Sequence, residues 1–232
     1  MQNELRKHIV RIYKTMKKPK NSFSDKLREI IIEVFIIVIA ITLSIWLDNW
    51  SEHRKQQKEV KEFLVDLKDD LNKDVESMNN KKETLTKAVQ EYSSMESQSL
   101  NSEQLEKQKP KIHFSIFLIT KTTNYGNYEG FKSSGKIGFI ENKKLKKLML
   151  EYFEKNVSSA NMAVELYNSQ LNKLWDFALE NGDKMDKAIL SSKARRLFNF
   201  TIKVANGTIK EYDENKKLAK ELISEIDKVT KE

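Results

Sequence analysis

The most apolar stretch of the chain covers residues 30–47, in which Glu33 is the only charged side chain. A helix of this length extends about 27 Å at about 1.5 Å per residue, which is close to the thickness of a bilayer core. Trp46 and Trp50 are one helical turn apart at its C-terminal end, where interfacial tryptophans are expected. The pattern predicts a transmembrane helix over residues 29–50.

Two other kinds of segment are also this apolar, and the sequence argues against both. A helix buried in a soluble core does not need so many isoleucines followed by a pair of tryptophans. A cleaved signal peptide has a shorter apolar region and ends in a small-x-small site, which Asp48, Asn49 and Trp50 do not provide. We therefore interpret the segment as an uncleaved membrane anchor.

Residues 51–95 follow this segment without a proline or a glycine. Apolar residues recur in them at steps of three and four or sums of these steps, which predicts an amphipathic helix that continues the membrane helix. The stripe consists of Val60, Leu64, Leu67, Leu71, Val75, Met78, Leu85, Val89 and Tyr92.

The middle of the chain carries most of the turn signals. Residues 96–111 are rich in Ser, Gln and Lys and predict a loop. The apolar run 112–120 is short enough to be either a strand or a buried piece of helix, and periodicity does not decide between them. Residues 122–140 hold four of the six glycines and are expected to be irregular, before a short amphipathic helix over residues 143–153.

Two further helices are predicted in the C-terminal part, and Asn181 with Gly182 ends the first of them. Their apolar stripes have the 3.5-residue period of antiparallel bundles and coiled coils. The sequence therefore predicts an all-α fold, in which an N-terminal single transmembrane helix continues into an elongated antiparallel helical bundle. The stripes are Ala160, Val164, Tyr167, Leu171, Leu174 and Ala178, then Phe198, Ile202, Ala205, Ile209, Tyr212, Lys216, Ala219, Ile223 and Ile226.

The charges of the chain are unevenly distributed. It has 42 basic and 34 acidic residues, but residues 1–28 alone hold nine basic and two acidic ones. This tail has a net charge of +7 and the remaining 204 residues have a net charge of +1, which is not typical of a nucleic-acid-binding domain. The positive-inside rule places residues 1–28 in the cytoplasm and residues 51–232 across the membrane. Lys26 and Arg28 are expected to anchor the membrane interface, beside anionic lipid head groups.

The predicted membrane helix has one face of small and polar residues. Small residues let helix backbones approach, and polar residues within a membrane seek partners or water. This face is either the seam of a homo-oligomer or the lining of a pore, and in the simplest alternative its terminal carboxylates lie among head groups. The face consists of Glu33, Ile37, Ala40, Ser44 and Asp48, at steps of four, three, four and four.

One motif suggests nucleotide binding, and we reject it. Residues 130–136 fit the G-x-x-x-x-G-K pattern of a phosphate-binding loop. Ile137 follows where a Ser or Thr hydroxyl must bind magnesium, and no buried strand precedes the loop. We interpret Ser133, Ser134 and Gly135 as a turn motif in which Gly135 ends a helix.

The chain lacks the clusters that catalysis or metal binding would need. It has no cysteine, which excludes disulfides, thiolate metal sites and a cysteine nucleophile. His8, His53 and His113 fall in three separate predicted regions. The carboxylates have lysines three or four residues away, a spacing typical of solvated ion pairs. We expect no enzyme activity, no catalytic residue, no cofactor, no metal, and no nucleotide or nucleic acid as partner.

The residues at the membrane segment also carry a family resemblance. Residues 33–55, EVFIIVIAITLSIWLDNWSEHRK, resemble the signature of an uncharacterised family of single-pass membrane proteins of Bacteroidota-type bacteria. That signature opens with Gly-Glu and closes with Asn-Asn-Trp-Asn-Glu, to which residues 48–52 are similar, and the Ser-Ser-Gly turn at residues 133–135 is similar to a second family motif. Ile32 and Ala40 stand where the family has glycine. The resemblance implies an inner-membrane anchor and a periplasmic helical domain, and it implies no activity.

Three functions are compatible with these patterns. The first is a membrane-anchored helical interaction or scaffold protein, which self-associates or serves as an accessory subunit with other envelope membrane proteins. The second is an oligomeric channel or gating subunit lined by the polar face of the membrane helix. The third is a periplasmic sensor domain, although only about 28 residues remain in the cytoplasm to transmit a signal.

Overall fold

The computed structural model describes residues 2–16, 23–98, 115–122 and 125–231, and all regular secondary structure in these ranges is helical. This confirms the predicted all-α fold. The chain divides into two compact units, Met1–Glu59 and Val60–Glu232. The helices are α1 (Gln2–Met16), α2 (Phe23–Gln98), α4 (Gly126–Ser133), the 3-10 helix η1 (Lys136–Phe139), α5 (Lys143–Leu150), the π-helix η2 (Glu151–Asn156), α6 (Val157–Asn181), the 3-10 helix η3 (Gly182–Lys184), α7 (Met185–Ala188) and α8 (Ser192–Lys231).

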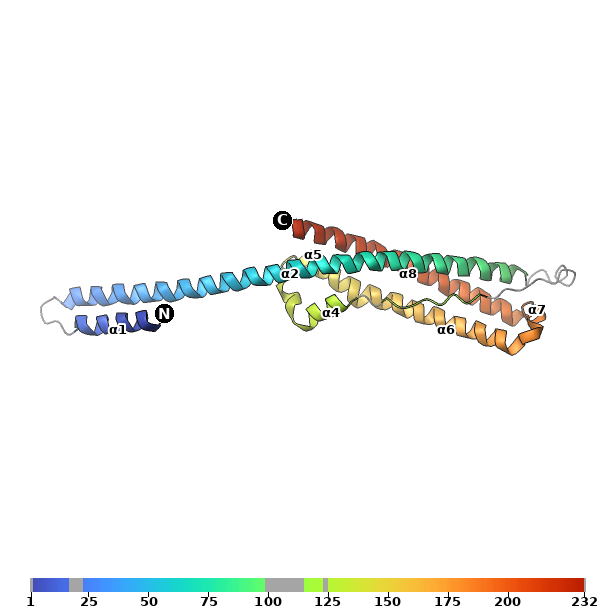
Figure 1. Cartoon of the computed structure of the whole chain (residues 1–232), viewed down its shortest axis with the longest axis horizontal. Helices are drawn as coiled ribbons and strands as arrows, with labels where there is room; N and C mark the ends of the chain where they lie inside the picture. Colours follow the sequence, from blue (N-terminus) through green and yellow to red (C-terminus); the bar gives the residue numbers. More distant parts are fainter. Residues whose placement is uncertain (1, 17–22, 99–114, 123–124, 232) are drawn as a thin grey trace. The chain divides into compact units, whose positions relative to one another are not determined.

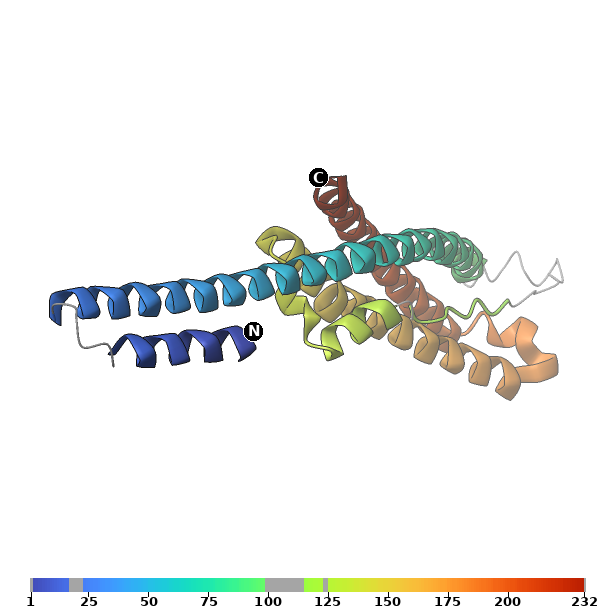
Figure 2. The same ribbon diagram turned by 60° about the vertical axis from the view of Figure 1, so that its left-hand side comes forward.

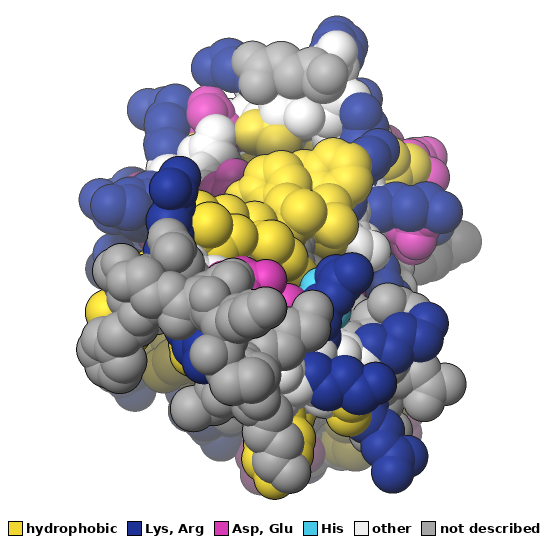
Figure 3. Space-filling model, turned by 90° about the vertical axis from the view of Figure 1, so that its left-hand side faces the viewer, with side chains coloured by type: hydrophobic (Ala, Val, Ile, Leu, Met, Phe, Trp, Pro, Cys, Tyr) yellow, Lys and Arg dark blue, Asp and Glu magenta, His cyan; other side chains and the backbone are white. Residues whose placement is uncertain are grey.

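The first unit contains the apolar stretch of α2, whose side chains lie on the surface of the protein. Helix α2 is long and apolar enough to cross a membrane, and none of its most apolar window is buried. Phe35 is 64% exposed and Trp46 is 59% exposed. A core helix of a soluble protein would be mostly buried, so this alternative does not apply. Figure 3, viewed from the end at which α2 begins, shows hydrophobic side chains gathered in one patch with Lys and Arg around it.

The second unit is an antiparallel bundle built on three long helices. The later part of α2 runs in the same direction as α6, and α8 runs back against both (Figures 1 and 2). Helices α4 and α5 lie at the end of the bundle where α6 begins, and α7 lies at the other end (Figure 1). The predicted bundle is thus confirmed, with two cores that differ in position along it.

The first core lies toward α7 and the second lies toward α4 and α5. Helices α2, α6 and α8 contribute to the first, and the second adds α4, α5 and η2. The fully buried aromatic side chains of the first core are Tyr92, Tyr167, Phe198 and Tyr212, and those of the second are Tyr128 and Tyr152. Phe63 of α2 stacks on Phe131 of α4 with ring centroids 3.8 Å apart, which attaches α4 to the bundle.

The segment from α5 to α6 is one uninterrupted helical rod, whereas the sequence suggested two helices separated near residue 154. Asn142 caps its start, since its side-chain oxygen accepts a 2.9 Å hydrogen bond from the backbone N–H of Leu145. The apolar stripes before and after η2 are out of phase, which a π-helical turn corrects because it changes the rotation per residue. The rod ends at Asn181 as predicted, with Gly182 at φ 36°.

The buried seam of α8 differs from the predicted stripe. The predicted Phe198, Ala205 and Tyr212 are fully buried, but Ile202 and Ile209 are only half-buried. The second row of the seam instead consists of Thr201, Thr208, Asn215 and Leu222. An analysis of hydrophobic periodicity assigns isoleucine to the core before threonine or asparagine. It therefore placed the row of Ile202 and Ile209 in the core instead of the neighbouring row that is buried.

The threonines of this row are buried without loss of hydrogen bonds. The Thr201 hydroxyl donates to the Leu197 carbonyl at 2.8 Å, and Thr208 donates to Val204 at 3.0 Å. Bonding to a carbonyl in the preceding turn satisfies the hydroxyl within its own helix. The Thr208 hydroxyl is also 3.3 Å from the carbonyl of Ala163, so α6 and α8 approach closely there.

The middle of the chain is partly as predicted. Of the run 112–120, residues 115–120 are neither strand nor helix but extended chain, and residues 112–114 lie outside the described residues. Of the predicted loop 96–111, residues 96–98 continue α2 and the others also lie outside the described residues. The expectation that residues 122–140 are irregular was wrong, because α4 and η1 occupy most of this range.

Candidate functional site

The predicted polar face of the membrane segment lies on α2 in the first unit. Glu33, Ile37 and Ser44 are half-buried, whereas Ala40 and Asp48 are exposed. Among the described residues, the Glu33 side chain has one oxygen, Oε2, that is shielded from solvent and has no hydrogen-bond partner. A shielded carboxylate oxygen without a donor costs free energy, so this oxygen would be stabilised by water or by a donor from another molecule.

The hydroxyl groups and tryptophans around this face have different environments. The Thr42 hydroxyl donates to the Val38 carbonyl at 2.7 Å, so it is satisfied within α2. The predicted interface residues Trp46 and Trp50 are both exposed, and the Arg54 guanidinium lies 4.8 Å from the Trp50 ring centroid. This cation–π pair places a charge one turn beyond the last tryptophan, as expected where an apolar helix enters water.

The other predicted interface residues precede the apolar stretch. Lys26 is half-buried and Arg28 is exposed. Both lie in the first turns of α2, before the run of exposed isoleucines that starts at Ile31. Basic side chains therefore stand at one end of the apolar stretch and a tryptophan–arginine pair at the other.

The predicted turn motif ends α4. Ser133 is its last residue, Ser134 follows, and Gly135 has a φ of 74°, which favours glycine over residues with a Cβ. The Gly135 N–H donates to the Lys132 carbonyl at 2.9 Å and the Ser134 hydroxyl donates to the Phe131 carbonyl at 2.8 Å. The phosphate-loop pattern of residues 130–136 thus coincides with a helix terminus, and the described residues before it include no strand of the kind that a nucleotide site would need.

A buried polar layer, which sequence analysis did not predict, separates the two cores of the bundle. Asp74 of α2 is 1% exposed and lies between Leu71 of the second core and Met78 of the first. The Tyr152 hydroxyl of η2 donates a 3.0 Å hydrogen bond to Asp74 Oδ2. Burial of the Tyr152 side chain and the nearby Asp74 carboxylate both raise the pKa of Tyr152, so it remains the donor.

One further buried residue belongs to this layer, and the half-buried Lys81 lies at its edge. Asn215 of α8 is 1% exposed and donates to the carbonyl of Asn156, the last residue of η2, at 3.2 Å. Lys81 lies two turns after Asp74 on α2, and partial burial lowers its pKa while the Asp74 carboxylate opposes that effect. The layer therefore joins both α2 and α8 to the π-helical turn η2, where the Asn156 carbonyl accepts the side-chain donor from α8.

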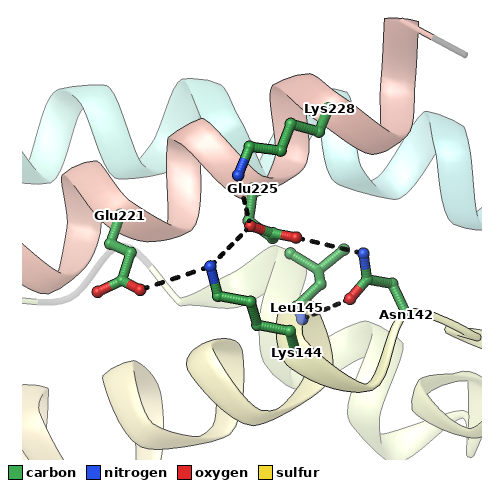
Figure 4. A network of polar contacts seen from close by, with 6 residues as sticks. All are labelled: Asn142, Lys144, Leu145, Glu221, Glu225 and Lys228. Carbon is green, nitrogen blue, oxygen red and sulfur yellow. Dashed lines mark hydrogen bonds and ion pairs between the residues drawn. The ribbon is translucent and has the colours of Figure 1, made fainter.

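A second carboxylate, Glu225 of α8, fixes α5 to the bundle (Figure 4). Its side chain is 9% exposed and lies 3.0 Å from Lys144 Nζ and 3.1 Å from Lys228 Nζ. Hydrogen bonds from these two ammonium groups lower the pKa of Glu225. Asn142 also contacts Glu225 at 3.4 Å, so the residue that caps α5 also contacts α8.

The extended segment 115–122 is held by side chains instead of a neighbouring strand. Asn168 accepts from the Ile119 N–H at 3.2 Å and donates to the Ile119 carbonyl at 2.7 Å. Asn161 pairs in the same way with Thr122, at 2.9 and 3.2 Å. Each asparagine amide thus makes the pair of hydrogen bonds that the backbone of a neighbouring β-strand would otherwise make.

The spacing of these asparagines matches the geometry of the two elements. Seven residues of helix advance about 10.5 Å, and three residues of extended chain advance about 10 Å. Asn161 and Asn168 are seven apart on α6, and their partners Thr122 and Ile119 are three apart. On α2, Glu91 accepts from the Ser115 N–H at 2.8 Å, and the Tyr92 hydroxyl donates to the Ser115 carbonyl at 2.9 Å. The segment is therefore bonded to both α2 and α6.

An open cavity of about 300 Å³ lies where this segment meets α4 and α6. Met162, which is 68% exposed, contributes an apolar side chain, and Lys121 forms an ion pair with Glu165 of α6. Tyr128 donates to Glu154 at 2.5 Å and stacks on Phe153 with centroids 4.2 Å apart. The cavity is lined by Lys121, Tyr125, Tyr128, Glu129, Phe153, Val157, Ser158, Asn161, Met162 and Glu165.

The sequence model of a family of unknown function, DUF6090, matches residues 33–213. The chain belongs to the DUF6090 family. No curated protein and no solved structure matches it. The part shared with DUF6090 begins at Glu33 on the polar face of α2 and includes the buried polar layer around Asp74, except for Asn215. The Bacteroidota-type origin and the closing motif at residues 48–52 stay predictions.

The described residues of this DUF6090 protein contain no group of three or more His, Asp and Glu side chains that could hold a metal ion. Two of its sites nevertheless have an arrangement that points to a function. They are the polar face of α2, with its shielded Glu33 oxygen, and the open cavity where the segment 115–122 meets α4 and α6.

Proposed function

We propose that this DUF6090 protein is a membrane-anchored helical scaffold that associates with itself or with other membrane proteins of the bacterial envelope. The apolar stretch of α2 crosses the inner membrane, with residues 1–28 in the cytoplasm and the bundle in the periplasm. The exposed isoleucines of α2 support the anchor, since exposing so much apolar surface to water costs about 25 cal/mol per Å². The basic tail supports the orientation.

The observation that carries the association is the shielded Oε2 of Glu33, which has no hydrogen-bond partner among the described residues. In a membrane, a donor for such an oxygen comes from another helix, from water or from head groups. Ala40 and Ser44 on the same face allow a second helix to approach closely. A second copy of α2 would bring both the small residues and a second polar face.

Disulfide cross-linking tests this proposal directly, because the chain has no cysteine of its own. Single variants Ala40→Cys and Ser44→Cys are oxidised in native membranes, and Val38→Cys on a different side of α2 is the matched control. We expect dimers from the first two variants and little dimer from the third. Equal cross-linking at all three positions, or none at any, would exclude a homo-oligomeric seam on this face.

The anchor and its orientation have a separate test. Carbonate washing of membranes distinguishes a spanning protein from a peripheral one, and protease added to intact spheroplasts reaches only periplasmic segments. We expect the protein to remain in the membrane and residues 51–232 to be digested. A protein that is released by carbonate would refute the anchor, whatever the cross-linking result.

A channel or gating subunit is the alternative that the same face supports. Glu33 and Asp48 would then line an aqueous path, and carboxylates in such a path attract cations. Conductance of the reconstituted protein, compared with Glu33→Gln and Asp48→Asn, tests this alternative. A conductance that both substitutions leave unchanged would argue against it.

A periplasmic sensor is the second alternative, and the cavity beside α4 is the observation that favours it. Its volume of about 300 Å³ is at the lower end for small-molecule sites, and its lining combines aromatic, charged and amide groups. Thermal stabilisation by a panel of small polar metabolites, compared between the native chain and Met162→Trp, tests whether the cavity binds a ligand. If no compound raises the melting temperature of the native chain more than that of Met162→Trp, ligand sensing at this cavity is ruled out.

A further inference from the structure

Helix α1 carries large apolar side chains that are exposed. The sequence suggested only a basic tail there, but residues 2–16 form a continuous helix. Ile9 is 59% exposed, Val10 is 47% exposed and Tyr13 is 61% exposed. Large exposed apolar side chains on a helix mark an interaction surface. A tail that only supplied positive charge beside the membrane segment would not need them.

Apart from Arg6 and Val10, which lie at the border between them, the two kinds of side chain lie on different faces of α1. Ile9, Ile12 and Tyr13 are three and four residues apart, so they share one face. Lys7, Arg11 and Lys14 are spaced four and three apart and share the opposite face. A helix with an apolar face and a lysine- and arginine-rich face is the type that lies in the interface of a membrane.

We infer that α1 is an interfacial helix that binds the surface of an anionic phospholipid bilayer, with Ile9, Ile12 and Tyr13 inserted among the acyl chains. This inference rests on the proposed membrane crossing by α2. Charge complementarity selects an anionic lipid surface as the occupant, because the tail has a net charge of +7. Residues inserted at the boundary between head groups and acyl chains remove the exposed apolar surface from water.

The connection to α2 is short enough to keep α1 at the membrane surface. Six residues, 17–22, separate the end of α1 from the start of α2. A fully extended chain of that length spans about 20 Å, so α1 ends near the cytoplasmic surface of the membrane that α2 crosses. The tether also raises the effective concentration of α1 at that surface, which lets a weak interfacial helix stay bound.

The full-length protein provides the test, since its lack of cysteine allows a single fluorescent label. Ile9→Cys and Lys14→Cys are each labelled with the polarity-sensitive dye NBD and reconstituted in vesicles of phosphatidylcholine with or without phosphatidylglycerol. We expect the label at position 9 to shift to the blue and to be quenched by spin-labelled lipid when phosphatidylglycerol is present. The label at position 14 should remain in water.

Two control variants separate membrane insertion of α1 from a change in its charge and from a loss of the anchor. The label at position 9 is measured again in the presence of Lys14→Ala, because Lys14→Cys itself removes one cation. Adding Ile12→Asn and Tyr13→Asn should abolish the blue shift at position 9 while leaving the protein resistant to carbonate. That resistance shows that the α2 anchor is intact, so failure of the inference is distinguishable from failure of the proposed function.

Two outcomes would overturn the inference. The first is equal exposure to water of the labels at positions 9 and 14 in vesicles with phosphatidylglycerol. The second is a blue shift at position 9 that is the same with and without phosphatidylglycerol and is not quenched by spin-labelled lipid, which would mean that a protein surface covers α1. Either result would leave the cross-linking and carbonate tests of α2 unaffected.

Discussion

The Tyr152 hydroxyl donates a 3.0 Å hydrogen bond to Asp74, a carboxylate that is 1% exposed between the two cores of the bundle. A buried carboxylate that loses its donor keeps its desolvation cost. The bond joins α2 to the π-helical turn, so it fixes which residues of the two helices face each other. Polar groups in an apolar core are known to specify register in this way.

Tyr152→Phe should therefore destabilise the bundle by about 1–3 kcal/mol, measured by chemical denaturation of the full-length protein in detergent. Tyr167→Phe and Tyr212→Phe are matched controls, because both tyrosines are buried and their hydroxyl oxygens have no hydrogen-bond partner among the described residues. These two substitutions should have little effect or should stabilise. A similar loss for all three variants would mean that ring packing, and not the bond to Asp74, is responsible.

The ion pairs of Glu225 determine how the stability of the bundle should depend on pH. Hydrogen bonds from Lys144 and Lys228 hold the pKa of Glu225 below its usual value. A carboxylate with a depressed folded-state pKa contributes stability above its unfolded pKa of about 4.3, and that contribution is lost as the pH falls through the folded-state pKa. The melting temperature of the native chain should therefore fall below about pH 4.3.

Glu225→Gln should lower the melting temperature at pH 7 and flatten its decrease at low pH. Glu221→Gln is the matched control, because Glu221 is 49% exposed and lies 3.7 Å from the same Lys144. Exposed pairs contribute little, so the control should resemble the native chain. Parallel curves for the native chain and Glu225→Gln would contradict the role given to this carboxylate.

The asparagine pairs on α6 should hold the extended segment 115–122 in place. Asn168→Ala removes both hydrogen bonds to Ile119, and we expect a loss of about 1–3 kcal/mol. Hydrogen exchange at the Ile119 amide should accelerate more than exchange in the core of α8. Asn168→Asp keeps the oxygen that accepts from Ile119 but loses the donor, so it should give an intermediate effect. Unchanged exchange at Ile119 in Asn168→Ala would show that other contacts hold the segment.

The extent to which sequence predicted this structure depends on the type of residue. The long helices follow from apolar residues at steps of three and four, and the same pattern correctly places Leu64, Leu67 and Leu71 in the core, where they are fully buried. Asp74 was missed because a charged residue within an apolar stripe is normally assigned to the surface. Its position between Leu71 and Met78 at helical spacing was the available signal.

The hydrogen bonds from the asparagines of α6 to the segment 115–122 could not be predicted for a different reason. Asn161 and Asn168 act on a segment about 40 to 50 residues earlier, and no local pattern relates an asparagine to a distant peptide group. The π-helical turn was hidden too, since it appears in sequence only as a change of phase between two regular stripes. The polar face of α2 was found from spacing alone, but the shielded Oε2 of Glu33 became visible only with side-chain atoms in place.

Two glycines give opposite predictions for the same substitution. Gly207 lies within α8, and a Cβ built on it meets no atom within 4 Å. Gly207→Ala should therefore stabilise the bundle by about 0.5–1 kcal/mol, because alanine loses less conformational freedom in a helix. Gly135 also has open space around it, but its φ of 74° lies in the left-handed region.

Gly135→Ala should consequently destabilise by about 1–2 kcal/mol, although the added methyl group clashes with nothing. The free energy of unfolding of both variants, measured in the same detergent, checks the pair. Because space is available at both sites, the difference in sign isolates the backbone conformation as its cause. Stabilisation by both substitutions would mean that residues 133–135 can end α4 without a left-handed residue.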